Sequence, residues 1–183
     1  MFNYLRIRNI RRYLTDDATN ILVLSLVMSH LDYCNAILFG LPQCDLNKMQ
    51  RIQNMCAKLV LRLRKYDSSK QALFQLHWLP IKARIEFKIL TVMYNCSKGQ
   101  APEYLTELLH EQVSGRRLRS ADQISGCFEV PFNKCKTFGD RGFRTVGPLL
   151  WNRLPCDLKN SKSIDTFKKD LKHTFFRNFD SWF

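Results

Sequence analysis

The spacing of apolar residues along the chain predicts helices over most of its length. Apolar positions recur every three or four residues in several segments, which is the period of an α-helix. The helices expected from this pattern cover residues 3–14, 16–31, 45–65, 69–76, 80–98, 103–111, 143–154 and 163–177. Apolar residues occupy nearly every face of segment 16–31, so we expect that helix at the centre of the core. The pattern therefore predicts a mostly α fold, a helical bundle.

The helical periodicity is interrupted by a polar segment after about residue 112. The polar, basic stretch SGRRLRSADQ, residues 114–123, is the best candidate for an internal boundary. It divides a helical region, residues 1–112, from a C-terminal extension, residues 113–183, that holds a basic loop and two helices. The alternating stretch CFEVPFNKCKTF could form a small β-hairpin around residues 126–138, with Pro131 restricting it to an edge.

The adjacent aspartates Asp16 and Asp17 admit two interpretations, a polymerase metal site or the start of a helix. A two-metal site needs carboxylates that converge from separate segments. The polymerase form also places an aromatic residue two positions before the pair, where this chain has Leu14. Thr15 is a suitable N-cap, and acidic residues in a first turn are favoured by the helix dipole. We therefore predict a helix start and no metal site.

The chain of 183 residues has a net charge of +13, which indicates a protein that binds polyanions. Nucleic acid is the first such partner and an acidic membrane the second. A solvated basic surface without a ligand stays open as an alternative. The longest apolar run, residues 21–28, is far shorter than the roughly 20 residues that span a bilayer, so no membrane partner is expected.

Two groups of basic residues are the candidate phosphate contacts. One group lies along a single face of the expected helix 45–65, and the other follows it in the polar boundary segment. Their members are Lys48, Arg51, Lys58, Arg62 and Lys65, and then Arg116, Arg117 and Arg119. A one-sided basic stripe can follow a phosphate backbone, although an ordinary amphipathic surface helix explains it equally well. No catalytic motif, metal-ligand cluster or cofactor-binding loop accompanies these residues, so no catalytic residue, metal or cofactor is expected.

The seven cysteines indicate a reducing compartment. Their number is odd, their spacing is wide and no CxxC occurs, so we expect an intracellular protein, nuclear or cytoplasmic. Cys34, Cys56 and Cys96 fall within apolar helical patterns, where a free thiol behaves as a small hydrophobe. His30 and Cys34 lie four residues apart, and we expect them to pack in the core instead of binding zinc.

Several longer segments together carry a resemblance to a known family. In order along the chain they are SHLDYCNAILFGLP, LNKMQRIQNMCAKLVLR, LHWLPIKARIEFKILTVMY, KGQAPEYLTELL, RRLRS, TFGDRGFRTVGPLLWNRLP and SIDTFKKDLK. They resemble the region that follows the catalytic domain in reverse transcriptases of non-LTR, LINE-type retrotransposons of the jockey-like and chicken-repeat-type groups. The likeness covers residues 5–179, nearly the whole chain.

The resemblance implies a helical thumb followed by the C-terminal extension of such an enzyme. In that family the thumb holds the RNA template with its growing DNA strand, while the polymerase carboxylates and the endonuclease lie upstream. This sequence contains neither, so we expect a non-catalytic fragment that binds RNA, DNA or both without sequence specificity. The absent palm and fingers are a further candidate partner. The alternative is a helical structural or protein-interaction module, which could self-associate through apolar surface that the missing parts would cover.

Overall fold

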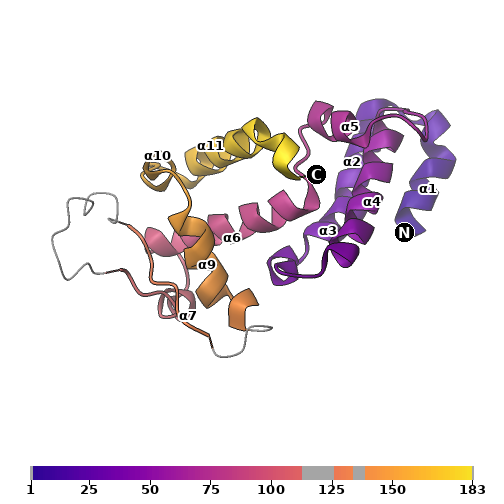
Figure 1. The fold of residues 1–183 in the computed structure, drawn as a ribbon. Helices are drawn as coiled ribbons and strands as arrows, with labels where there is room; N and C mark the ends of the chain where they lie inside the picture. The colour runs from indigo at the N-terminus through magenta and orange to yellow at the C-terminus, as the bar shows by residue number, and fades with distance from the viewer. Residues whose placement is uncertain (1, 113–125, 134–138, 183) are drawn as a thin grey trace. The chain divides into compact units, whose positions relative to one another are not determined.

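The computed structural model describes residues 2–112, 126–133 and 139–182 (Figure 1), and the prediction of a mostly α-helical chain is confirmed. The α-helices in order are α1 (Phe2–Ile10), α2 (Asp16–Val23), α3 (Ser29–Asp32), α4 (Gln43–Val60), α5 (Ser69–Gln75), α6 (Ile81–Ser97), α7 (Glu103–Thr106), α9 (Phe143–Asn152), α10 (Cys156–Lys159) and α11 (Ile164–Arg177). The described ranges contain a single isolated β-bridge and no sheet.

The chain divides into two compact units. The first unit contains residues 1–84 and 178–183, and the second contains residues 85–177. Helix α6 crosses the division, so its first turn belongs to one unit and its remaining turns to the other. The boundary predicted between residues 112 and 113 falls at the edge of residues 113–125, which lie outside the described part, and it stays a prediction.

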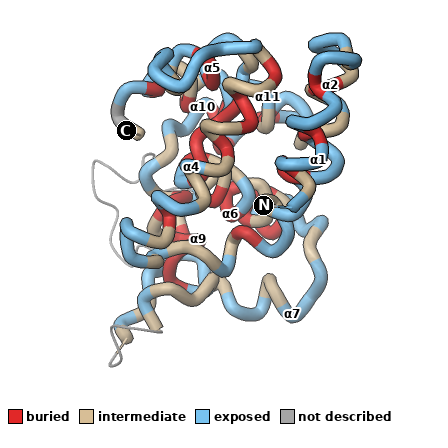
Figure 2. The backbone as a smooth tube through the Cα atoms, turned by 90° about the vertical axis from the view of Figure 1, so that its right-hand side faces the viewer, coloured by how far each residue is buried: buried red, intermediate tan, exposed pale blue. Residues whose placement is uncertain are grey.

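The core of the first unit forms where α4 packs against its neighbours. Cys56, Ala57 and Val60 are buried along one face of α4, and the buried residues follow the inner faces of the helices in Figure 2. The side chain of Gln53 is also fully buried, and its amide donates to the carbonyl oxygen of Leu79 at 2.8 Å. A buried amide is tolerated because this hydrogen bond satisfies it.

The segment that follows Thr15 begins as predicted but is not a central core helix. The Thr15 hydroxyl accepts a hydrogen bond from the Ala18 backbone at 3.2 Å, which confirms the N-cap. After α2 the helix continues through a π-helical stretch, Leu24–Met28, in which Val27 and Met28 are buried. In contrast, Ile21 and Leu24 are 65% and 40% exposed. The expectation of full burial was wrong because one face of the segment packs on the unit and the opposite face does not.

The region around His30 and Cys34 also differs from its prediction. Helix α3 ends at Asp32, and Cys34 takes a left-handed conformation with a φ of 50°. His30 and Cys34 are both exposed, so the prediction that they pack in the core was wrong. Once the chain leaves the helix after Asp32, the two residues no longer share a face. Cys56 and Cys96 are buried as expected.

The second unit is organised around aromatic side chains. The Tyr94 ring stacks on that of Phe167 with centroids 4.6 Å apart, and the Tyr94 hydroxyl donates to the carbonyl oxygen of Ser161 at 2.8 Å. Helix α9 includes Pro148, as predicted, and contributes the buried ring of Trp151. The Ser163 hydroxyl accepts a hydrogen bond from the Thr166 backbone N–H at 3.2 Å, so Ser163 caps the start of α11.

The extended segment near Phe128 pairs with the end of the preceding helical region. Phe128 forms an antiparallel bridge with Glu111. The Asn152 side-chain oxygen accepts a hydrogen bond from the Phe128 N–H at 3.0 Å, and the Asn152 amide donates one to the Phe128 carbonyl oxygen at 2.7 Å. Helix α7 ends at Thr106, five residues before the predicted limit, and Glu111 lies in this extended pairing instead of in a helix. The second half of the predicted hairpin, residues 134–138, lies outside the described part.

Candidate functional site

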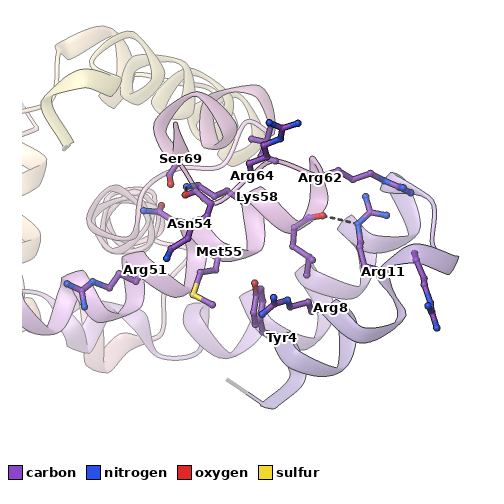
Figure 3. A pocket seen from close by; sticks show the side chains of 14 residues that line it. Tyr4, Arg8, Arg11, Arg51, Asn54, Met55, Lys58, Arg62, Arg64 and Ser69 are labelled. Carbon is purple, nitrogen blue, oxygen red and sulfur yellow. Dashed lines mark hydrogen bonds between the residues drawn. The ribbon is translucent and has the colours of Figure 1, made fainter. Parts of the chain in front are cut away.

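The first unit contains a hollow of about 930 Å³, shown in Figure 3. Its lining comes from α1 and the 3₁₀ turn Arg11–Tyr13 after it, from α4, and from the loop that leads into the first residue of α5. The lining residues are Tyr4, Arg8, Arg11, Arg12, Arg51, Asn54, Met55, Lys58, Leu59, Arg62, Leu63, Arg64, Lys65 and Ser69. Eight of these fourteen residues are arginine or lysine, and none is acidic. The lining therefore concentrates positive charge around one cavity.

The end of α4 shapes one side of this hollow. The helix stops at Val60, so the predicted helix 45–65 was too long by five residues. The Leu63 backbone N–H donates to the carbonyl oxygen of Lys58 at 2.9 Å, and Arg62 takes a φ of 54°. This is the geometry of a helix C-terminus closed by a left-handed residue. Arg62 and Lys65 consequently leave the helix, and the predicted basic stripe does not continue along one helical face.

Arg11 joins the first segment of the chain to the end of α4. Its side chain is buried, and the guanidinium donates to the carbonyl oxygens of Leu59 and Val60, each at 2.8 Å. These are carbonyls of the last turn, which lack partners within the helix. A cation at this end is also favoured by the helix dipole. Arg11 therefore has a structural role in forming the wall of the hollow.

Asp16 binds two arginines of the lining. Its carboxylate accepts from Arg11 at 2.5 Å and from Arg62 at 3.1 Å. The hydrogen bond from Arg11, followed by that from Arg62, holds the pKa of Asp16 below its ordinary value of 3.8. The helix-start interpretation of the aspartate pair is thus confirmed, and the Asp16 carboxylate stabilises the junction between α2 and the end of α4.

Besides Arg12, which lies over the ring of Tyr13, three arginines of the lining have no ion-pair partner. Arg8, Arg51 and Arg64 are exposed, and within the described ranges no carboxylate forms an ion pair with any of them. Lys58 donates to the carbonyl oxygen of Lys65 at 2.8 Å, which leaves its charge unneutralised as well. These four cations are available to an anionic ligand without breaking an ion pair.

The inner wall of the hollow is less polar than its rim. Tyr4 is almost completely buried, Met55 and Leu59 are partly buried, and Leu63 is exposed at the edge. Figure 3 shows Tyr4 beside Arg8, with Met55 facing the same space. Burial raises the pKa of the Tyr4 phenol, although the charge of Arg8 opposes this effect. The phenol therefore stays protonated at neutral pH.

The structure brings together part of the predicted site. Arg51, Lys58, Arg62 and Lys65 all line the hollow. Lys48 is not among the lining residues, and it forms an ion pair with Asp45 at 2.8 Å. The other predicted contacts, Arg116, Arg117 and Arg119, lie outside the described part of the chain.

Sequence reasoning missed the apolar and neutral members of the lining and four of its eight basic residues. The four basic residues are Arg8, Arg11, Arg12 and Arg64. The run RIRNIRR contains the signal for three of them, because it places Arg8 and Arg12 four residues apart in a helical pattern. Nothing in the local sequence places that run beside α4, since their contact depends on tertiary structure.

Across the described ranges, no group of three or more His, Cys, Asp or Glu side chains is arranged to hold a metal ion. A search of the same residues for a helix with the length and apolar character needed to cross a membrane finds none. Comparison of the chain with protein-family models, with curated proteins and with solved structures gave no match.

Proposed function

We propose that this chain binds RNA, DNA or both without catalysing a reaction, as a fragment similar to the post-palm region of a LINE-type reverse transcriptase. The observation that supports the proposal most directly is the gathering of eight cationic side chains around one hollow. Arginine and lysine on phosphate oxygens position a strand but read no base, so the expected binding is independent of sequence.

The charge balance of the hollow favours a polyanion in particular. Cations held close together repel one another, and a strand with a phosphate at every nucleotide relieves several of these repulsions at once. Asp16 already compensates Arg11 and Arg62, whereas Arg8, Arg51 and Arg64 have no such partner. We therefore assign the main phosphate contacts to Arg8, Arg51 and Arg64, together with Lys58.

Salt dependence of binding tests this assignment. Each phosphate that a cation neutralises adds about 0.9 to the log–log salt slope on duplex DNA. Replacing Arg8, Arg51 and Arg64 by glutamine should therefore lower the slope by about 2–3 while leaving the ion pairs of Asp16 intact. The measurement is fluorescence titration of a labelled RNA–DNA hybrid at several salt concentrations.

A charge-matched variant separates the hollow from the net charge. Lys88, Lys162 and Lys169 are exposed residues of the second unit, and their replacement by glutamine removes the same three charges. We expect this variant to keep most of the parental slope. Equal losses in the two variants would show that overall charge, not the hollow, controls binding, and a flat salt response in the parent chain would refute the proposal.

The non-catalytic part of the proposal has its own test. The polymerase carboxylates of the resembled family lie upstream of the matching region, and Asp16 is bound to two arginines. Primer extension with Mg²⁺ or Mn²⁺ on an RNA template should therefore show no nucleotide incorporation. Incorporation that persists in an Asp16→Asn, Asp17→Asn variant would place a catalytic site elsewhere in the chain.

A second candidate function, a protein-interaction module, is supported by exposed apolar side chains. Ile21, Leu24 and Leu26 are all exposed on the segment after Thr15. Light scattering at increasing protein concentration distinguishes the two functions. Oligomers that are insensitive to salt and to nucleic acid would favour the interaction module, while a monomer whose mass rises only when nucleic acid is added would favour the first proposal.

A further inference from the structure

The apolar inner wall of the hollow is not explained by phosphate binding alone. A surface that only follows a phosphate backbone needs cations and hydrogen-bond donors. Here the lining also contains the partly buried side chains of Met55 and Leu59, with Leu63 at the edge. The volume of about 930 Å³ also lies within the range of roughly 300–1,000 Å³ typical of sites that enclose small molecules.

We propose that the hollow receives one unpaired nucleotide of a single strand, with its base against Met55 and Leu63 and its phosphates at Arg8, Arg51 and Arg64. This inference rests on the proposed function and narrows its ligand from nucleic acid in general to an unpaired segment. Every nucleobase presents an apolar face, so such a contact tolerates any sequence. The polarisable sulfur of Met55 is well suited to pack against an aromatic ring.

Pairing controls access to the hollow. In a duplex the bases are stacked inside the helix and turned toward their partners, so that only the backbone reaches a protein surface. Bases of single strands and loops can be displaced from the stack and inserted into protein pockets. The Asn54 amide and the Tyr4 hydroxyl, both in the lining, offer hydrogen bonds to the edge of an inserted base.

An abasic strand provides the sharpest test. An oligodeoxynucleotide of abasic residues carries the same phosphates as an ordinary single strand of equal length but has no bases. We expect the ordinary strand to bind about tenfold more tightly than the abasic strand, with a duplex closer to the abasic strand. Equal affinities for the ordinary and abasic strands would overturn the inference and leave the proposed function standing. Failure of every nucleic acid to bind would refute both.

A matched pair of methionines locates the base contact. Met55 lines the hollow, whereas Met49 is a similarly half-buried residue of α4 that does not. The Met55→Ala variant should bind the ordinary single strand about fivefold more weakly and bind the abasic strand unchanged. The Met49→Ala variant should bind both strands as the parent does. An equal effect of Met55→Ala on the two strands would refute a base contact at this position.

Cross-linking supplies an independent readout. A single strand with one 5-iodouracil, irradiated with the full chain, should form its cross-link at Met55 or Tyr4, as located by mass spectrometry of the digested protein. A cross-link confined to residues outside the lining would overturn the inference even if the affinities differ as expected.

Discussion

The guanidinium of Arg11 shows how one buried charge can organise a surface of otherwise exposed charges. It satisfies two carbonyls at the end of α4 and bonds the Asp16 carboxylate at the start of α2. Only a planar group with several donors can serve these acceptors together. The neighbouring Arg12 has a different environment, since it is exposed and lies over the ring of Tyr13.

Substitution of these two arginines should separate their roles. Arg11→Lys keeps the charge but leaves at least one buried carbonyl without a donor, which we expect to reduce the free energy of unfolding by about 1–3 kcal/mol. The matched Arg12→Lys change should alter it by less than about 0.5 kcal/mol. Urea unfolding followed by circular dichroism measures both, and equal effects would contradict the role assigned to Arg11.

The acid dependence of stability should report on Asp16. Its pKa is lowered in the folded state by Arg11 first and Arg62 second, relative to an ordinary value of 3.8. A group with a depressed folded pKa stabilises the fold above its unfolded pKa, and this stabilisation disappears as pH falls through the folded pKa. Urea unfolding midpoints should therefore drop less steeply between pH 4 and pH 2 in Asp16→Asn than in the parent, and equal slopes in the two proteins would contradict this role of the Asp16 carboxylate.

At the scale of single elements, the residues that end a helix decide how well its limits could be predicted. Thr15 and Ser163 are caps whose partners lie three residues away, so the sequence indicates both helix starts. The end of α4 differs because a left-handed Arg62 closes it, and arginine carries no local signal for that conformation. The ion pair between Arg62 and Asp16 that accompanies it spans 46 residues and is invisible to periodicity.

The close approach of α9 to α6 gives an element-scale prediction. A Cβ at Gly147 would lie 2.5 Å from the Met93 sulfur, and Met93 is fully buried. Helix propensity alone predicts that Gly147→Ala stabilises by about 1 kcal/mol. We expect the overlap to reverse the sign, with a loss of about 1–2 kcal/mol in the free energy of unfolding.

A double-mutant cycle checks the cause of that loss. In a Met93→Ala background the overlap is absent, so Gly147→Ala should become neutral or stabilising there. Thermal unfolding of the four proteins gives the coupling energy. If Gly147→Ala costs the same in both backgrounds, contact with Met93 is not the reason for the loss.

At the scale of the whole molecule, α6 is the element that both compact units contain. Its buried residues include Ile81 in the first unit and Ile89, Met93 and Tyr94 in the second. Because α6 contributes buried residues to both units, we expect its backbone amides to exchange with solvent only when the whole chain unfolds. Hydrogen exchange should therefore be slowest in α6, and exchange of its central amides as fast as those of α1 would contradict this expectation.

The candidate site was less predictable than the fold because its residues come together only in the tertiary structure. Periodicity identified the helices because that signal is present in each short segment, whereas the class of partner inferred from the net charge stays a prediction. The hollow instead combines Arg8 with Arg51, Lys58 and Arg64, which are more than forty residues away along the chain. The apolar composition of the segment after Thr15 likewise could not show which of its faces would be exposed. Ile21 and Leu24 lie on the exposed face.

The attachment of the first segment to the end of α4 through Arg11 would link ligand binding to folding if the proposed strand occupies the hollow. Such a strand would contact both sides of this attachment, so its binding should raise the melting temperature in proportion to the logarithm of ligand concentration. Trimming the chain to begin after Tyr13 would remove one wall of the hollow together with the group that satisfies the α4 terminus. Shortened versions should then lose binding and thermal resistance together, and added ligand would restore neither.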